Sequence, residues 1–149
     1  MQAEFELRCP ISADLGFIRD LIRMYGHHSG LRDPRLDNLV LAVNEAVTNV
    51  LDHAGKGGLI TARTTSEAVT VEVLDTAGRL TDDHLTAART LDQTATHGYG
   101  LWVIQHLCDA VHLEQTDLGS RLSLKMRLRP ALRGRLGTPF RLAALLSHL

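Results

Sequence analysis

The sequence predicts an α+β protein, a two-layer sandwich in which helices cover one face of a mixed, mostly antiparallel sheet. Segments of alternating polar and apolar residues, typical of half-buried strands, are interleaved with segments of helical period. They follow the order strand, helix, helix, strand, strand, loop, helix, strand, strand. The chain has 149 residues, of which 44% are hydrophobic and 22% charged, and this suits one domain with its own core.

The N-terminal part holds the first strand and the first helix. Residues 4–9 alternate as a half-buried strand does, and Pro10 ends the alternation. Ser12 is a suitable N-cap, so a helix is expected over residues 13–28.

The second helix is the most clearly marked element. It is expected to run from Pro34, with Asp33 as its N-cap, to a glycine stop at Ala54-Gly55. Its apolar residues fall on one face at the helical period. The opposite face gathers the polar residues Asn38, Glu45, Asn49, Asp52 and His53.

The C-terminal half alternates between strands, a long loop and one helix. We expect strands at 58–66, 68–75, 111–116 and 120–128, a loop over 76–97 with a short helix near 82–90, and a helix over 98–109. A loop of this length inside a compact domain is usually functional or mobile.

Positive charge is concentrated at the C-terminal end. Residues 1–117 carry 9 Lys and Arg against 17 Asp and Glu, whereas residues 118–149 carry 7 Lys and Arg and no carboxylate. This basic segment is expected to contact either an acidic partner or the protein's own acidic body. No apolar run suits a membrane span, and no secretory signal is recognisable. Two distant cysteines indicate neither a disulfide scaffold nor a zinc site, so the expected location is the cytoplasm.

Three short motifs place chemically useful residues at the ends of expected elements. Glu45 and Asn49 lie one turn apart on the second helix, a carboxylate and a carboxamide suited to general-base work and to Mg²⁺. Asp75 ends a strand before a glycine turn and can accept a hydrogen bond from a ligand amino group. Gly98-Tyr99-Gly100-Leu101 opens a helix, where glycines free backbone N–H groups for a phosphate. Taken alone, the first two motifs are explained better by a solvated helix face and by a turn, and two glycines do not distinguish a phosphate site from a helix start.

In this order the motifs resemble the GHKL superfamily of ATP-binding domains, whose Bergerat fold is such a sandwich. Within it, the short chain and the segment 44–54, Asn-Glu-Ala-Val-Thr-Asn-Val-Leu-Asp-His-Ala, resemble the bacterial anti-sigma-factor serine kinases of the RsbW/SpoIIAB type. The segment 98–104 and the Gly119-Ser120 turn before the last strand fit the same family. The resemblance covers residues 1–128 as a single ATP-binding domain and leaves 129–149 as a basic C-terminal extension.

The resemblance implies a role for each matching residue. Asn49 is expected to hold the Mg²⁺ that bridges the phosphates of ATP, and Glu45 to be the general base on a serine hydroxyl. Asp75 is expected to accept the adenine amino group. Further nucleotide contacts are expected from Gly78, Gly98, Gly100, Leu101 and Ser120. Residues 79–97 are the expected lid, with His53 at the rim of the pocket.

The adenine loop departs from the family pattern. The family commonly has Asp-x-Gly-x-Gly, whereas this chain reads Asp75-Thr76-Ala77-Gly78-Arg79, so Ala77 and Arg79 stand at glycine positions. Arg79 adds bulk and charge near the nucleotide, and we therefore expect weaker binding or a rearranged lid.

The function that the resemblance implies is partner switching. A homodimeric, ATP-binding anti-sigma factor sequesters a sigma factor and phosphorylates a serine on a STAS-type anti-sigma antagonist. The helix over 13–28 and the sheet edge are the candidate dimer or partner surfaces.

Three alternatives stay open at this point. Ala77 and Arg79 favour a catalytically inactive interaction module of the same fold. A nucleic-acid contact through the basic C-terminus is disfavoured, because Phe140 is the one aromatic residue there that can stack on bases. A partial histidine-kinase catalytic domain is disfavoured because no helix pair with a phosphoacceptor histidine is recognisable.

Overall fold

The computed structural model describes residues 6–53, 57–77, 81–89 and 99–129 of the chain. In chain order its elements are β1 (Leu7–Pro10), α1 (Leu15–Ser29), α2 (Arg35–His53), β2 (Gly58–Thr64), β3 (Ala68–Asp75), α3 (Asp82–Arg89), α4 (Tyr99–Leu107), β4 (Ala110–Thr116) and β5 (Gly119–Arg127). None of these helices, within the described ranges, is long and apolar enough to cross a bilayer.

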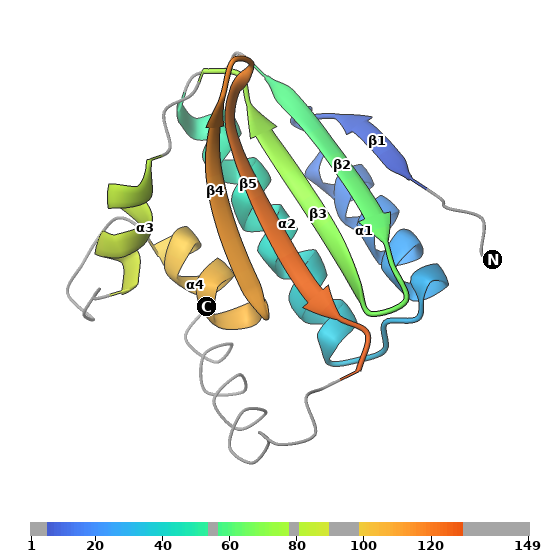
Figure 1. Cartoon of the computed structure of the whole chain (residues 1–149). Helices are drawn as coiled ribbons and strands as arrows, with labels where there is room; N and C mark the ends of the chain where they lie inside the picture. The colour runs from blue at the N-terminus through green and yellow to red at the C-terminus, as the bar shows by residue number, and fades with distance from the viewer. Residues whose placement is uncertain (1–5, 54–56, 78–80, 90–98, 130–149) are drawn as a thin grey trace.

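The strands form one five-stranded sheet in the order β1-β2-β3-β5-β4, and every pairing is antiparallel. As Figure 1 is drawn, α1 and α2 pack together behind the sheet, and α4 packs against α2. The face of the sheet toward the viewer carries none of the described helices. The predicted two-layer α+β sandwich is confirmed, with antiparallel pairing throughout.

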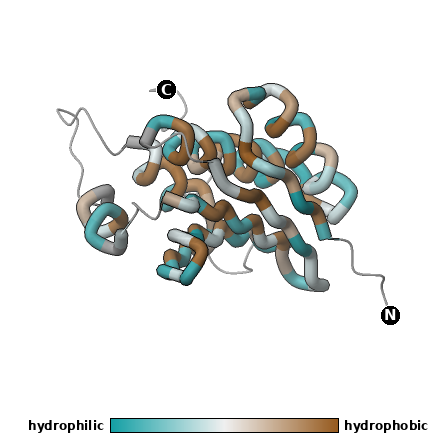
Figure 2. Tube along the Cα trace, turned by 90° about the horizontal axis from the view of Figure 1, so that it is seen from above, coloured by the Kyte–Doolittle hydropathy of each residue, from teal (hydrophilic) through white to brown (hydrophobic). Residues whose placement is uncertain are grey.

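The core lies between the sheet and α2. Because side chains alternate along a strand, Ile60, Val71 and Leu124 all point to the helices, where they are fully buried. Leu39 and Val47 meet them from α2 and are equally buried. Figure 2 shows the matching alternation of hydrophobic and hydrophilic residues along the strands. This packing fixes the direction and depth of α2, which carries two of the predicted site residues.

The start of α1 differs from the prediction. Asp14, not Ser12, is the N-cap, and its Oδ1 accepts a hydrogen bond from the backbone N–H of Phe17 at 3.1 Å. The Ser12 hydroxyl instead accepts from the N–H of Asp14 at 3.2 Å, so both polar side chains satisfy backbone donors ahead of the helix. The sequence offers two competent caps two residues apart, and the helix begins after the second.

The polar side of α2 is not a solvent-facing stripe as projected. Asn38 is only 4% exposed, and Glu45 and Asn49 are half-buried. The reason is that α2 packs against α1 on one flank and α4 on the other, in addition to the sheet.

Much of the basic C-terminal charge belongs to the sheet and not to a tail. Arg121, Lys125 and Arg127 lie in β5, between β3 and β4. For these three residues the basic segment 118–149 is therefore no separate tail, because they lie in the strand expected at 120–128 and strand pairing places them inside the domain. Residues 130–149 of the predicted extension lie outside the described residues.

Candidate functional site

The first turn of α4 lies directly against two polar side chains of α2. A Cβ built at Gly100 meets Glu45 Oε1 at 3.0 Å, Asn49 Oδ1 at 3.5 Å and Asn49 Nδ2 at 3.6 Å. Glycine at this position lets the helix N-terminus approach the carboxylate and the carboxamide without a side chain between them. The structure thus brings together three predicted site residues, although Gly100 is 55 positions from Glu45 in the sequence.

Asp75 and Ser120 form the second part of the site. They are paired across β3 and β5 and are 7% and 1% exposed. Gly119 has φ +139°, and a Cβ there falls 2.1 Å from the Asp75 carbonyl oxygen, so only glycine allows the β4–β5 turn to approach the end of β3. The Ser120 hydroxyl donates a hydrogen bond to Gln115 Oε1 at 3.0 Å.

A narrow cavity joins the two parts. Its volume is about 20 Å³, and Asn49, Asp75 and Ser120 line it together with apolar side chains of α2, β3 and β5. This is little more than the space of one water molecule. An adenine ring therefore enters only if the elements that line the cavity, α2, β3 and β5, move apart.

The carboxylate of Asp75 is oriented by its own turn. Asp75 Oδ1 accepts a hydrogen bond from the backbone N–H of Ala77 at 3.0 Å, as in an Asx turn. Among the described residues, Oδ2 has no hydrogen-bond partner, so it can accept one from a ligand amino group. No described non-glycine residue has positive φ, so alanine replaces the family's glycine at Ala77 without backbone strain.

Glu45 is half-buried, and its surroundings favour the protonated form of its carboxyl group. Burial, followed by the negative charge of Asp52, raises its pKa above the ordinary glutamate value. The described residues offer no hydrogen-bond donor to its carboxylate, nor any partner to the Asn49 amide. From the sequence, Asp52 is placed on the polar face of the helix, and its effect on the pKa of Glu45 is missed. The signal was its spacing of seven residues from Glu45, which places both side chains on one side of a helix.

The remaining predicted residues divide into two groups. Leu101 is 7% exposed and its side chain belongs to the core, so any ligand contact from it would come from its backbone. Gly78 and Gly98 lie outside the described residues, as does most of the expected lid. Within that segment α3 confirms the short helix predicted near 82–90, and it packs on α4.

The donor set suits a magnesium ion shared with a ligand. The described residues contain no cluster of three or more His, Cys, Asp or Glu able to hold a metal by themselves. Mg²⁺ is usually bound through one or two protein oxygens plus phosphates and water, and Asn49 Oδ1 supplies such a protein oxygen. The fit therefore depends on a phosphate-bearing ligand.

Three elements that carry predicted site residues, α2, β3 and α4, all lie within the part of the chain that a known family model matches. The sequence matches the family model of the histidine kinase-like ATPase domain over residues 12–126, and the chain belongs to that family.

The solved structures add a likeness in fold. Matching chains number 17, and among them is one from the crystal structure of the SiaB-SiaC complex from Pseudomonas aeruginosa. It is 17% identical, with a TM-score of 0.54, and the match covers 83% of this chain and 89% of that chain. A comparison with curated protein sequences gives no significant match.

Proposed function

We propose that this protein binds Mg-ATP between α2, the end of β3 and the start of α4, and transfers the terminal phosphoryl group to a serine of a partner protein. One observation carries the proposal: Asn49 lines a cavity with Asp75 and Ser120 and also lies beside Gly100 at a helix N-terminus. Groups suited to an adenine and groups suited to phosphates therefore meet at one side chain.

Glu45 acts as the general base in this proposal. Its carboxylate accepts the proton of the serine hydroxyl while the hydroxyl oxygen bonds to the γ-phosphorus. The bond between that phosphorus and the bridging oxygen breaks, and ADP leaves with the electron pair. The raised pKa of Glu45 increases its affinity for the proton, and its missing hydrogen-bond donor leaves the carboxylate oxygens available.

The helix N-terminus and Asn49 position the phosphates. Backbone N–H groups in the first turn of α4 donate to phosphate oxygens, and the helix dipole favours their negative charge. Asn49 Oδ1 holds Mg²⁺, which when bound neutralises charge on the phosphate oxygens. Asp75 Oδ2 accepts the adenine amino group and so fixes the other end of the nucleotide.

We further propose that the partners are a sigma factor, which the protein sequesters, and a STAS-type antagonist, which carries the acceptor serine. The support is the likeness of residues 44–54 to the anti-sigma-factor serine kinases and the fold shared with a chain of a two-protein complex. We also propose a homodimer. On α1, Phe17 and Met24 are 54% and 64% exposed and lie seven residues apart, which gives an apolar stripe for a second copy or a partner.

Calorimetric titration with ATP and with ADP, each with and without Mg²⁺, tests nucleotide binding first. We expect magnesium-dependent binding that Asn49→Ala weakens by about tenfold or more. Asn44→Ala is the matched control, because Asn44 lies on the same helix but accepts a hydrogen bond from Arg19 at 3.0 Å, away from the cavity. If both variants bind ATP equally well, Asn49 does not take part in nucleotide binding.

Transfer from labelled ATP to candidate STAS-domain proteins tests the kinase activity separately. Glu45→Gln should keep nucleotide binding and abolish transfer, since it preserves shape but removes the base. An inactive interaction module is the second candidate, favoured by the narrow cavity and by Arg79, which stands at a glycine position of the family pattern. Partner binding by a wild-type protein that neither binds nucleotide nor transfers phosphate would establish that alternative.

A further inference from the structure

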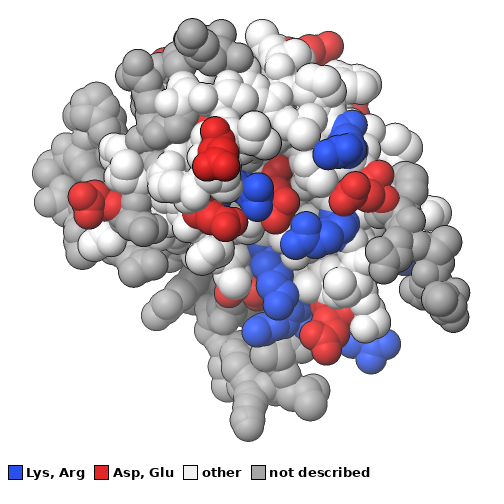
Figure 3. Space-filling model, turned by 45° about the horizontal axis from the view of Figure 1, so that its top comes forward, with Lys and Arg blue, Asp and Glu red and all other residues white. Residues whose placement is uncertain are grey.

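The face of the sheet away from the helices is a charged surface. Strand alternation places residues of all five strands on it, and the pairing register aligns them in rows such as Arg63, Thr70 and Lys125. Its cations are Arg8, Arg63, Arg121, Lys125 and Arg127. Its carboxylates are Glu72 and Glu114. Figure 3 shows Lys and Arg side chains over this side of the molecule, with Asp and Glu side chains among them.

The two carboxylates on this face already form ion pairs with two of its cations. Arg63 pairs with Glu72 at 3.5 Å, and Arg121 pairs with Glu114 at 3.2 Å. The side chains of Arg8, Lys125 and Arg127 have no ion-pair partner among the described residues. The surface therefore keeps an uncompensated positive charge in a protein whose net charge is −1.

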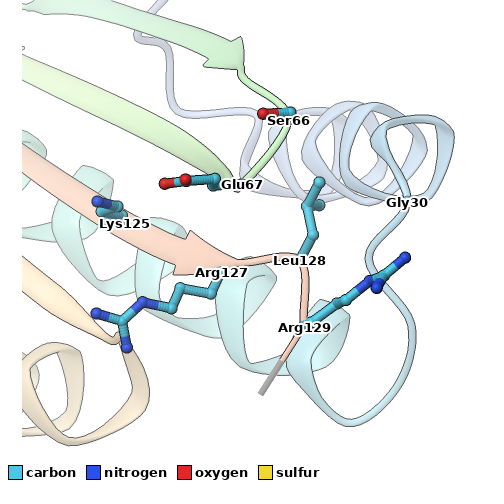
Figure 4. A pocket seen from close by; sticks show the side chains of 7 residues that line it. All are labelled: Gly30, Ser66, Glu67, Lys125, Arg127, Leu128 and Arg129. Atoms are coloured by element: carbon cyan, nitrogen blue, oxygen red, sulfur yellow. The ribbon is translucent and has the colours of Figure 1, made fainter. Parts of the chain in front are cut away.

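A cleft continues the charged face at its far end. It has a volume of about 540 Å³, and the described residues that line it include Lys125, Arg127 and Arg129 and a single carboxylate, Glu67 of the β2–β3 turn. Figure 4 shows the cleft between that turn, the end of β5 and Gly30 after α1. Ala68 and Arg127 are register partners at this end, seven residues along β3 from Asp75. At the usual rise per residue the cleft is roughly 20 Å from the nucleotide cavity.

We propose that this basic face and its cleft together form a docking surface for an acidic segment of a protein partner. The uncompensated cations favour a ligand that carries carboxylates. An extended acidic segment can lie along β5 and enter the cleft. A second copy of this chain is disfavoured, because its equivalent face has the same sign of charge. The face includes no Phe, Tyr or Trp among its described residues, and Glu72 and Glu114 interrupt the cations, which disfavours a nucleic-acid strand.

This surface is independent of the nucleotide chemistry. Along β3 and β5 the side chains of Asp75 and Ser120 point to the helix side, whereas those of Glu72, Ser123 and Lys125 point to the open side. A partner bound here leaves the cavity accessible. The result of nucleotide titration therefore neither supports nor refutes the proposed docking surface.

The test uses the full chain, without nucleotide, labelled for amide NMR. The probe is an alternating Glu-Ala peptide, and its Gln-Ala counterpart of equal length is the ligand control. We expect shifts in β5 and the β2–β3 turn with the acidic peptide only, and a decline of affinity as salt is added. Lys125→Gln with Arg127→Gln should weaken binding by about threefold to thirtyfold.

The matched control is Arg19→Gln with Arg23→Gln, which removes the same charge from two exposed positions on α1. It should leave peptide affinity and the pattern of shifts unchanged. The proposal is overturned if both double variants lose affinity equally, because net charge alone then explains binding. It is also overturned if oligothymidylate binds the same residues more tightly, or if the face shows shifts that depend on protein concentration without peptide.

Discussion

Replacing Gly100 by alanine separates the nucleotide site from the stability of the fold. The added Cβ lies 3.0 Å from Glu45 Oε1, closer than an ordinary carbon–oxygen contact, and 3.5 Å from Asn49 Oδ1. The atom that the new Cβ meets is at the end of the flexible Glu45 side chain, so the carboxylate can move aside by a few tenths of an ångström. The new methyl group then occupies the space between the α4 N-terminus and Asn49, where the proposed phosphates lie.

The expected magnitudes differ sharply between folding and binding. Glycine to alanine in a helix stabilises by about 0.5–1 kcal/mol, and displacing one carboxylate by a few tenths of an ångström offsets much of this gain. The net change in unfolding free energy should stay within about 1 kcal/mol, or about 4 °C in Tm. ATP affinity should fall by about tenfold or more, which is about 1.4 kcal/mol.

Gly16→Ala is the control for the backbone effect. Gly16 is the second residue of α1, as Gly100 is of α4, but its Cβ would meet no atom closer than 3.8 Å. Thermal unfolding and ATP calorimetry on both variants complete the experiment. Wild-type ATP affinity in Gly100→Ala, with the fold intact, would refute the placement of the phosphates at this helix.

Three further outcomes test other parts of the site. Gly119→Ala should lower the unfolding free energy by about 3 kcal/mol or more in urea denaturation, because φ +139° and the 2.1 Å approach to the Asp75 carbonyl oxygen both oppose a side chain. Glu45 has a raised pKa, so the folded state binds its proton more tightly than the unfolded chain, and stability falls as pH rises from the unfolded to the folded pKa. Glu45→Gln should therefore flatten that fall and be more stable than wild type at neutral pH; a steeper fall would contradict the assigned cause. Asp52→Asn should lower the Glu45 pKa and move the acid limb of the phosphoryl-transfer profile to lower pH, and an unchanged limb would exclude the charge of Asp52 as a contributor.

The sequence was most informative where local chemistry and periodicity agree. The second helix was predicted within a residue or so of its start, because its apolar period and flanking proline both act locally. Asp75 and Gly100 were found because each stands at the end of an element, where backbone groups and side chains are open to a ligand.

Contacts between distant elements were beyond sequence reasoning. The approach of Gly100 to Glu45 requires the packing of α4 on α2, and the burial of Asn38 is likewise not visible in the sequence. The choice of Asp14 over Ser12 as a cap depends on how the chain leaves β1. These are outcomes of tertiary structure that no local pattern contains.

The basic face shows why strand register decides what a charge pattern means. Counted along the chain, Arg121, Lys125 and Arg127 merge with the arginines beyond residue 129 into one basic block. Paired with β3, they alternate with buried Ser120, Leu122, Leu124 and Met126, so one strand presents apolar and nucleotide-site residues to the helices and cations to the other side. A shift of one residue in this pairing would exchange the two faces and bury the cations, at a cost no partner contact could offset. The same hydrophobic alternation that builds the core therefore holds the proposed docking surface in place, and substitutions of its exposed cations can be tested without disturbing the nucleotide side.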